Sequence, residues 1–262
     1  MKVSKKSLIV SIAVLCVYAL SLSAASFAWF TTSESAKVDT LNMSVTERSS
    51  LELTITGSNI GWKTTLTPAM FAQADYFYLN GESTTILNDV STNDMGSWVV
   101  GTYDEDNNNF DFTNGGKKAG KGEQEASWLE MPISFRSSAA GTVTLNEINF
   151  TVDNTKLNPA LRVGVVNGTT KTIYGNATKG YYQPVAADSE MFATRKDLTT
   201  TYKALADLKN YTIALSSTPD ADGYYTAQVT FYVWIEGSDD ACINKNTPAG
   251  VTAGVQFGQI EA

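Results

Sequence analysis

The sequence predicts an all-β protein, built as a single antiparallel β-sandwich or jelly roll with a long insertion and one or two short helices. From residue 37 onward, apolar and polar residues alternate with a period of two, the period of a β-strand. The chain has 19 Gly and only 6 Pro, and it is rich in Thr, Ser and Asn, a composition typical of strands joined by turns. Its 262 residues are enough to bury one sizeable core. No Pro- or Ser-rich linker divides the chain, so we expect one domain over residues 29–262, with an insertion at 60–127.

The first two expected strands lie within residues 38–56, where the alternation is interrupted by the short break RSS. The apolar positions are Leu41, Met43 and Val45 in the first strand and Leu51, Leu53 and Ile55 in the second. Because the break is short, the pattern predicts a hairpin.

Helical signals are few. Residues 66–77 predict one short helix, with Thr67 as N-cap and Pro68 in the first helical position, where its missing N–H is tolerated. Residues 200–208 predict a second.

Two later strands carry local irregularities. In residues 129–135, Pro132 cannot donate to a ladder, which predicts an edge strand or one that begins there. In residues 141–152, the apolar positions shift by one residue after Leu145, which predicts a bulge.

The last strands follow clear turn signals. Residues 161–166 and 172–175 predict a pair joined across Asn167 and Gly168. Residues 211–215 and 224–236 flank a turn rich in Pro, Asp and Gly. The strand at 224–236 is partly apolar on both faces, so we expect it to be central. Residues 251–260 predict the final strand.

The N-terminal 28 residues predict a secretory signal peptide. Lys2, Lys5 and Lys6 precede an apolar run over residues 8–22, and small residues follow it. Cleavage is expected between Ala28 and Trp29, or alternatively before Ser26. The open alternative is an uncleaved anchor, because residues 8–30 could cross a bilayer core of ~30 Å. Both alternatives place the rest of the chain outside the cytoplasm, so the protein is expected to be extracellular.

Charge and composition exclude several classes of function. The net charge is −8, from 19 basic and 27 acidic residues, and removal of residues 1–28 with their three lysines leaves 16 basic residues and −11. Such a chain repels nucleic acid and anionic lipid. There is no histidine, the commonest general base and zinc ligand. Without residues 1–28, Cys16 is lost and Cys242 has no intrachain partner. We therefore expect no enzyme and no cofactor.

One acidic loop is a weak calcium candidate. Its candidate ligands are Asp104, Asp106, Asn108 and Asp111. The spacing begins like an EF-hand loop, but Asn109 stands where the sharp turn requires Gly, and Gly115 where a bidentate Glu belongs. A solvated surface loop is the simpler interpretation.

Two further groups of residues permit chemistry without indicating it. Glu236, Asp239 and Asp240 could serve as an acid–base pair only if a cleft separated them appropriately, and a strand leading into an acidic turn explains them equally well. Aromatic side chains at Trp98, Tyr181 and Tyr182 could form a sugar-stacking platform if they were exposed, although most aromatic residues of a sandwich lie in its core.

The segment AWFTTSESAKVDTLNMSV, residues 28–45, resembles the start of the TasA/camelysin family of secreted β-sandwich proteins from Gram-positive bacteria. The segment VTFYVWIEGSDDACIN, residues 229–244, is similar to a strand and turn in uncharacterised relatives with the same leader. The resemblance implies release by a SipW-type signal peptidase, with cleavage at Ala28 and Trp29. Together the two segments cover about 35 residues of the chain.

The resemblance also implies how the protein assembles. Subunits of the family form biofilm-matrix or pilus-like fibres when the freed N-terminal segment of one subunit completes the sheet of the next. Here residues 29–38 would be the donor strand, with Trp29, Phe30 and Val38 as its apolar contacts. The alternative is a monomeric cell-surface binding module, for instance for a glycan or host ligand. The proteolytic activity described for camelysin is not carried over, because the chain lacks His and HExxH.

Overall fold

A computed structural model describes residues 35–45, 51–80, 83–92, 94–104, 109–152, 159–175, 181–182, 195–196, 202–237 and 251–261. The chain divides into two compact units, Met1–Ser33 and Glu34–Ala262, and all described residues belong to the second. The predicted signal peptide and its cleavage site at Ala28 and Trp29 therefore lie outside the described residues.

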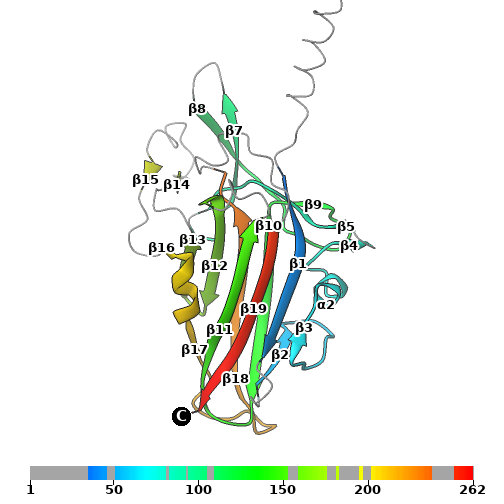
Figure 1. Ribbon diagram of the computed structural model, residues 1–262, viewed down its shortest axis with the longest axis vertical. Helices are drawn as coiled ribbons and strands as arrows, with labels where there is room; N and C mark the ends of the chain where they lie inside the picture. Colours follow the sequence, from blue (N-terminus) through cyan, green and yellow to red (C-terminus); the bar gives the residue numbers. More distant parts are fainter. Residues whose placement is uncertain are drawn as a thin grey trace, which may run out of the picture. The chain divides into compact units, whose positions relative to one another are not determined.

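The second unit is built almost entirely of strands (Figure 1). Up to residue 126 the elements are β1 (Ser35–Val45), β2 (Glu52–Ile55), β3 (Thr65–Leu66), α2 (Pro68–Gln73), β4 (Leu79–Asn80), β5 (Ser83–Thr84), β6 (Ile86–Asn88), β7 (Val99–Asp104), β8 (Asn109–Asn114) and β9 (Glu125–Ala126). The later elements are β10 (Trp128–Ser137), β11 (Gly141–Val152), β12 (Leu161–Asn167), β13 (Thr170–Gly175), β14 (Tyr181–Tyr182), β15 (Arg195–Lys196), β16 (Tyr202–Ala204), the 3₁₀ helix η2 (Leu205–Asn210), β17 (Thr212–Ala214), β18 (Tyr225–Ile235) and β19 (Val251–Glu261).

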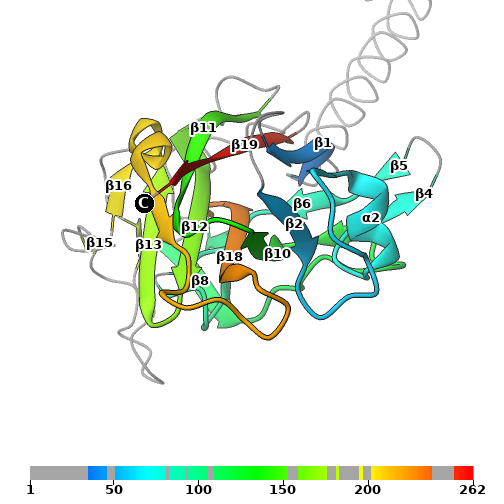
Figure 2. The same cartoon turned by 90° about the horizontal axis from the view of Figure 1, so that it is seen from below.

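Two sheets pack face to face, so the predicted all-β sandwich is confirmed. Within the described residues, the larger sheet has the order β17-β11-β19-β1-β6-β9, with β3 also paired to β1. The smaller sheet has the order β16-β13-β12-β18-β10-β2. Figure 2 shows the two layers from one end, with β11, β19 and β1 in one layer and β12, β18 and β10 in the other.

The core between the sheets is filled by aliphatic and aromatic side chains from both layers. Phe257 of β19 makes edge-to-face contact with Phe135 of β10 at a centroid distance of 5.0 Å. It also lies 6.0 Å from Phe231 of β18. All three rings are fully buried. Burying each such side chain stabilises the fold by roughly 1.5–3 kcal/mol.

The pairing is mostly antiparallel, with one important exception at the centre of the larger sheet. There β1 runs parallel to β19, from Val38 opposite Val251 to Val45 opposite Phe257. The shorter contacts β6–β9 and β13–β16 are also parallel. A purely antiparallel sandwich was therefore too simple an expectation. Alternation within a strand says which residues face the core, but not the direction of the neighbouring strand.

The predicted hairpin over residues 38–56 is wrong. Strand β1 lies in the larger sheet and β2 in the smaller one, where β2 pairs with β10. Both strands direct apolar residues into the same core, and crossing between the layers satisfies that pattern as well as a hairpin does. Lys63 exchanges backbone hydrogen bonds with Leu53 of β2 at 2.7 and 2.8 Å, while Thr65 and Leu66 pair with β1. Residues 63–66 thus join the two sheets along one side.

The interpretation of Pro132 as marking an edge or a strand start is also wrong, although its physical basis holds locally. Pro132 lies inside β10, which pairs along its whole length with the central strand β18. Its carbonyl oxygen accepts a hydrogen bond from the Thr56 N–H at 2.9 Å, just beyond the end of β2. The ring nitrogen faces the same side, where the named ladder with β2 ends, so Pro132 contributes only an acceptor to this last contact.

Several local predictions are confirmed. A register shift between Leu145 and Glu147 marks the bulge in β11. Strands β12 and β13 form a hairpin, in which Gly168 has φ +58° and Asn167 pairs with Thr170. Strand β18 lies between β12 and β10, in the interior of its sheet as expected.

The other turn and helix predictions are only partly met. Strands β17 and β18, which flank the predicted turn, belong to different sheets. Helix α2 starts at Pro68 after the N-cap Thr67, as predicted, but Thr67 makes no side-chain capping bond. In place of the second helix there is strand β16 followed by η2.

Candidate functional site

A strand donated by a neighbouring copy needs a free edge, so the edges of the larger sheet are the first candidate site. Strand β1 pairs with β6 through residues 35–37 and with β3 through Met43 and Ser44. Between these two contacts, residues 38–42 have no strand partner on that side among the described residues. Helix α2 follows β3 directly and packs beside β1 at this gap. Its Phe71 is fully buried, so the helix is anchored in the core beside β1.

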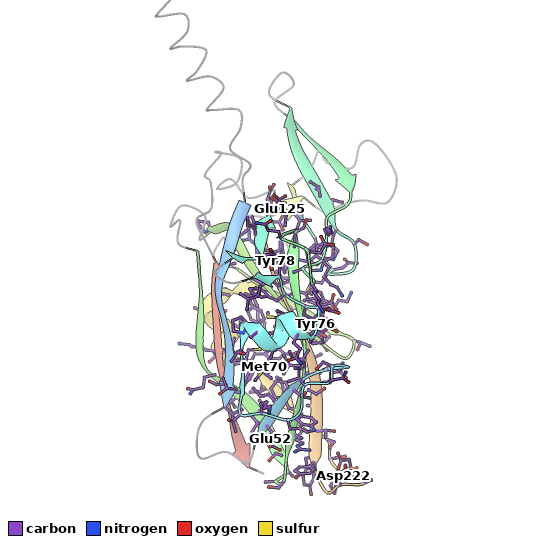
Figure 3. All side chains as sticks on the ribbon, turned by 90° about the vertical axis from the view of Figure 1, so that its right-hand side faces the viewer. Glu52, Met70, Tyr76, Tyr78, Glu125 and Asp222 are labelled. Carbon is purple, nitrogen blue, oxygen red and sulfur yellow. The ribbon has the colours of Figure 1, made fainter. Side chains whose placement is uncertain are left out.

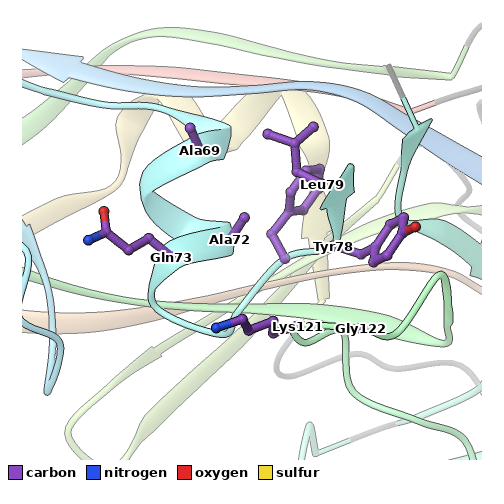
Figure 4. Close-up of a pocket in the computed structure, with 8 residues that line it drawn as sticks. Ala69, Ala72, Gln73, Tyr78, Leu79, Lys121 and Gly122 are labelled. Atoms are coloured by element: carbon purple, nitrogen blue, oxygen red, sulfur yellow. The ribbon is translucent and has the colours of Figure 1, made fainter. Parts of the chain in front are cut away.

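Figure 3 looks onto this side of the sandwich and shows α2, with Met70, lying between Tyr78 and Glu52. A cavity of about 350 Å³ lies against the helix. Ala69, Ala72 and Leu79 contribute to its apolar walls, and Gln73 and Lys121 add polar groups (Figure 4).

The opposite side of the larger sheet is covered in a similar way. Strand β11 pairs with β17 only over residues 142–144, so its remaining outer edge has no strand partner among the described residues. The helix η2 packs beside β11 and anchors itself through Leu205 and Leu208, which are buried. Covering an edge with a helix is one way in which proteins prevent unwanted strand pairing.

The predicted donor strand is only partly described. Its last residues belong to β1, where residues 35–37 pair with β6 and Val38 pairs with Val251 of the same chain. Trp29 and Phe30 lie outside the described residues. A segment available for donation would thus have to precede Ser35.

A second candidate site lies on the outer face of the smaller sheet, where residues 89–92 and 94–100 form what we call the strap. Its first end is attached by backbone hydrogen bonds from Val90 N–H to the Ile235 carbonyl at 2.9 Å and from Gly237 N–H to the Val90 carbonyl at 3.2 Å. The strap then folds back on itself, with Ser91 and Val99 exchanging bonds at 2.9 and 3.0 Å.

Tryptophan side chains fasten the strap to the sheet. Trp98 stacks on Trp128 of β10 at a centroid distance of 4.2 Å and an interplanar angle of 2°. It meets Trp234 of β18 edge-on at 5.5 Å. Trp98 is 9% exposed, so its interpretation as an exposed sugar-stacking residue is wrong. The side chains of Tyr181 and Tyr182, the other two residues suggested for that role, lie outside the described part of the chain.

Two carboxyl side chains, the half-buried Asp89 and the fully buried Glu236, lie where the strap joins the sheet. Glu236, at the end of β18, is fully buried; its Oε1 accepts a hydrogen bond from Ser91 Oγ and its Oε2 one from Trp234 Nε1 at 3.1 Å. Burial raises the pKa of Asp89 to about 6, a backbone hydrogen bond lowers it in part, and the charge of Glu236 raises it further. The sequence singled out Glu236 but missed Asp89 and Ser91, because no pattern connects residues so far apart in the chain.

Of the acidic residues that the sequence suggested as calcium ligands, the structure describes the backbone positions of two. Asp104 and Asp111 lie on the paired strands β7 and β8, where Asp104 is opposite Asn109 and Asp111 opposite Thr102. Asp106, Asn108, Asp239, Asp240 and Cys242 lie outside the described residues. Among the described residues, no group of three or more acidic or Cys side chains is arranged to hold a metal ion. Calcium binding by the acidic loop stays a prediction.

The fold and these sites define the class of protein: an all-β sandwich with helix-covered sheet edges and a tryptophan-anchored strap. In the part of the chain that the structure describes, no helix is both long and apolar enough to span a membrane. No family model, no curated protein and no solved structure matches this chain.

Proposed function

We propose that the protein is a secreted structural subunit of an extracellular fibre or pilus-like matrix, assembled by N-terminal strand donation after signal-peptide cleavage. The observation that carries the proposal is that helices lie beside the two strands of the larger sheet that are only partly paired on their outer sides among the described residues, α2 beside β1 and η2 beside β11. Covered edges suppress indiscriminate pairing between copies. Assembly would then depend on a dedicated segment, and the residues directly before β1 are the sequence's candidate for it.

An energy comparison indicates what the donated segment must do. Burying Trp29 and Phe30 contributes roughly 3–6 kcal/mol, whereas ordering six residues, 29–34, costs roughly 6–12 kcal/mol. The apolar contacts alone are therefore insufficient, and main-chain hydrogen bonds to the accepting sheet must supply the difference. This makes the proposal sensitive to loss of a backbone N–H as well as to loss of the aromatic side chains.

The test begins with N-terminal sequencing of the exported protein, for which Trp29 is expected as the first residue. Deleting residues 29–34 should abolish filaments in negative-stain images and leave monomers in sedimentation. Thr32→Pro should do the same because it removes an N–H, whereas the matched control Thr32→Ala should assemble normally.

Filaments that persist without residues 29–34 would contradict strand donation. A mature protein that stays monomeric at high concentration would instead favour the alternative, a cell-surface binding module. That alternative is checked with a glycan array.

A further inference from the structure

We propose that Asp89, beside the buried Glu236, is a pH-sensitive latch, which holds the strap on the smaller sheet when the Asp89 carboxyl is protonated and loosens it when that carboxyl is ionised. The latch lies at the first end of the strap, next to its backbone bonds with Ile235 and Gly237. It is independent of the donor segment, so its test does not depend on the proposed function.

The geometry places a half-buried carboxyl group, Asp89, beside a fully buried one, Glu236. Glu236 is fully buried and held from both sides, by Ser91 of the strap and Trp234 of the sheet. Asp89 is packed so closely that a Cβ on Gly237 would lie 2.9 Å from its Oδ2. A negative charge on Asp89 loses part of its hydration here, and the nearby charge of Glu236 disfavours it further.

Other charged groups lie on the elements packed against the strap. Arg162 of β12 is buried and donates from Nη1 to the carbonyls of Pro159 and Leu161. At the far end of the strap, Lys171 Nζ donates to the Asp94 carbonyl at 2.7 Å. On β10, Glu130 is paired with Lys118 at 3.4 Å. Glu236 is the group whose charge raises the pKa of Asp89, in addition to burial.

The direction of the effect follows from the raised pKa of Asp89, about 6 with the strap closed against 3.8 for a free carboxyl. The closed strap binds the proton more tightly than the open one. Its stabilisation is complete below pH 3.8 and is lost as the pH rises through about 6. Since Trp98 and the start of β7 belong to the same segment, loosening would free the tryptophan contacts and the attached β7–β8 hairpin together.

Hydrogen exchange on the purified protein tests the latch, read in peptides covering residues 89–104 and corrected for intrinsic exchange. Between pH 5 and 7.5, opening of the strap should increase about tenfold. Asp89→Asn should reduce this increase to less than twofold, and Glu236→Gln should weaken it, because each removes one of the two charges. The matched control Asp75→Asn, at an exposed turn, should behave like the wild type.

Peptides from β10, residues 128–137, distinguish local from global opening. They should show no comparable increase over the same pH range. An equal increase in β10, a strap that does not respond to pH, or an Asp89→Asn variant that keeps the full response would each overturn the latch.

Discussion

At the scale of single residues, Arg136 shows how side chains far apart in sequence fasten loops to a sheet. Its guanidinium lies between the rings of Trp62 and Tyr224, at 4.5 and 4.3 Å from their centroids. Its Nε donates to Glu52 Oε2 at 2.7 Å. The arginine thereby ties the loop after β2 and the turn before β18 to β10. Planar stacking on an aromatic ring requires a guanidinium, whereas the hydrogen bond to a carboxylate does not.

We expect Arg136→Lys to lower the free energy of unfolding by about 1–2 kcal/mol, because an ammonium keeps the charge but cannot stack on two rings. Glu52→Gln should cost less than about 1 kcal/mol, since the ion pair is partly exposed and screened by solvent. Urea unfolding at neutral pH measures both variants. Equal losses would mean that the ion pair, not the stacking, is the dominant contribution.

Gly164 is a single residue whose lack of a side chain lets a whole element, the strap, pack against β12. It lies on the outer face of β12, opposite Tyr232. A Cβ at this position would lie 2.0 Å from Met95 Sδ, so the strap rests directly on the backbone of the strand. Met95 has a positive φ of 55° and is 6% exposed, which leaves it little freedom to withdraw.

Gly164→Ala should therefore destabilise the protein by about 1–3 kcal/mol through overpacking. The double variant Gly164→Ala with Met95→Ala should recover part of the loss, because the clashing sulfur is gone. Gly61→Ala is the matched control, since a Cβ there meets nothing within 4 Å. Thermal unfolding followed by circular dichroism measures the series, and an unaffected Gly164→Ala variant would show that the strap moves freely.

At the scale of elements, the sequence predicted where strands lie better than which strands pair. Alternation, the phase shift after Leu145 and the turn at Gly168 are local signals, and each was confirmed. The partner of a strand depends on distant residues. Strands β1 and β2 carry the same inward pattern, yet they belong to opposite layers. Period and composition cannot separate those two arrangements, because both bury the same side chains.

The strap was missed for a related reason. Its residues show neither helical nor strand periodicity, and its attachments reach from Val90 and Ser91 to residues 235–237 near the other end of the chain. For Trp98, the sequence favoured a place in the core but left an exposed platform open. Only the stacking partner Trp128, contributed by β10, shows that Trp98 is buried.

At the scale of the whole molecule, the two sheets depend on each other through a few connecting segments. Residues 63–66 bond to β2 in one layer and β1 in the other. Leu215 N–H donates to the Gly141 carbonyl of the larger sheet, and Ser216 N–H to the Thr226 carbonyl of the smaller one. We infer that the layers unfold together. The latch at Asp89 is compatible with this, because the strap lies outside the sandwich core.

The parallel pairing of β1 with β19 has a mechanical consequence. The chain enters β1 at one end of the pair and leaves β19 at the other, so tension between the two termini pulls the strands past each other along their length. The hydrogen bonds from Val38 to Val45 would then be loaded together in shear, not broken one by one. In single-molecule pulling, we expect a clearly higher rupture force from the termini than with the N-terminal handle moved to a cysteine at Asn59, beyond β1. Equal forces would refute this. In the proposed fibre, tension that enters a subunit through its N-terminal segment would be borne first by the pairing of β1 with β19.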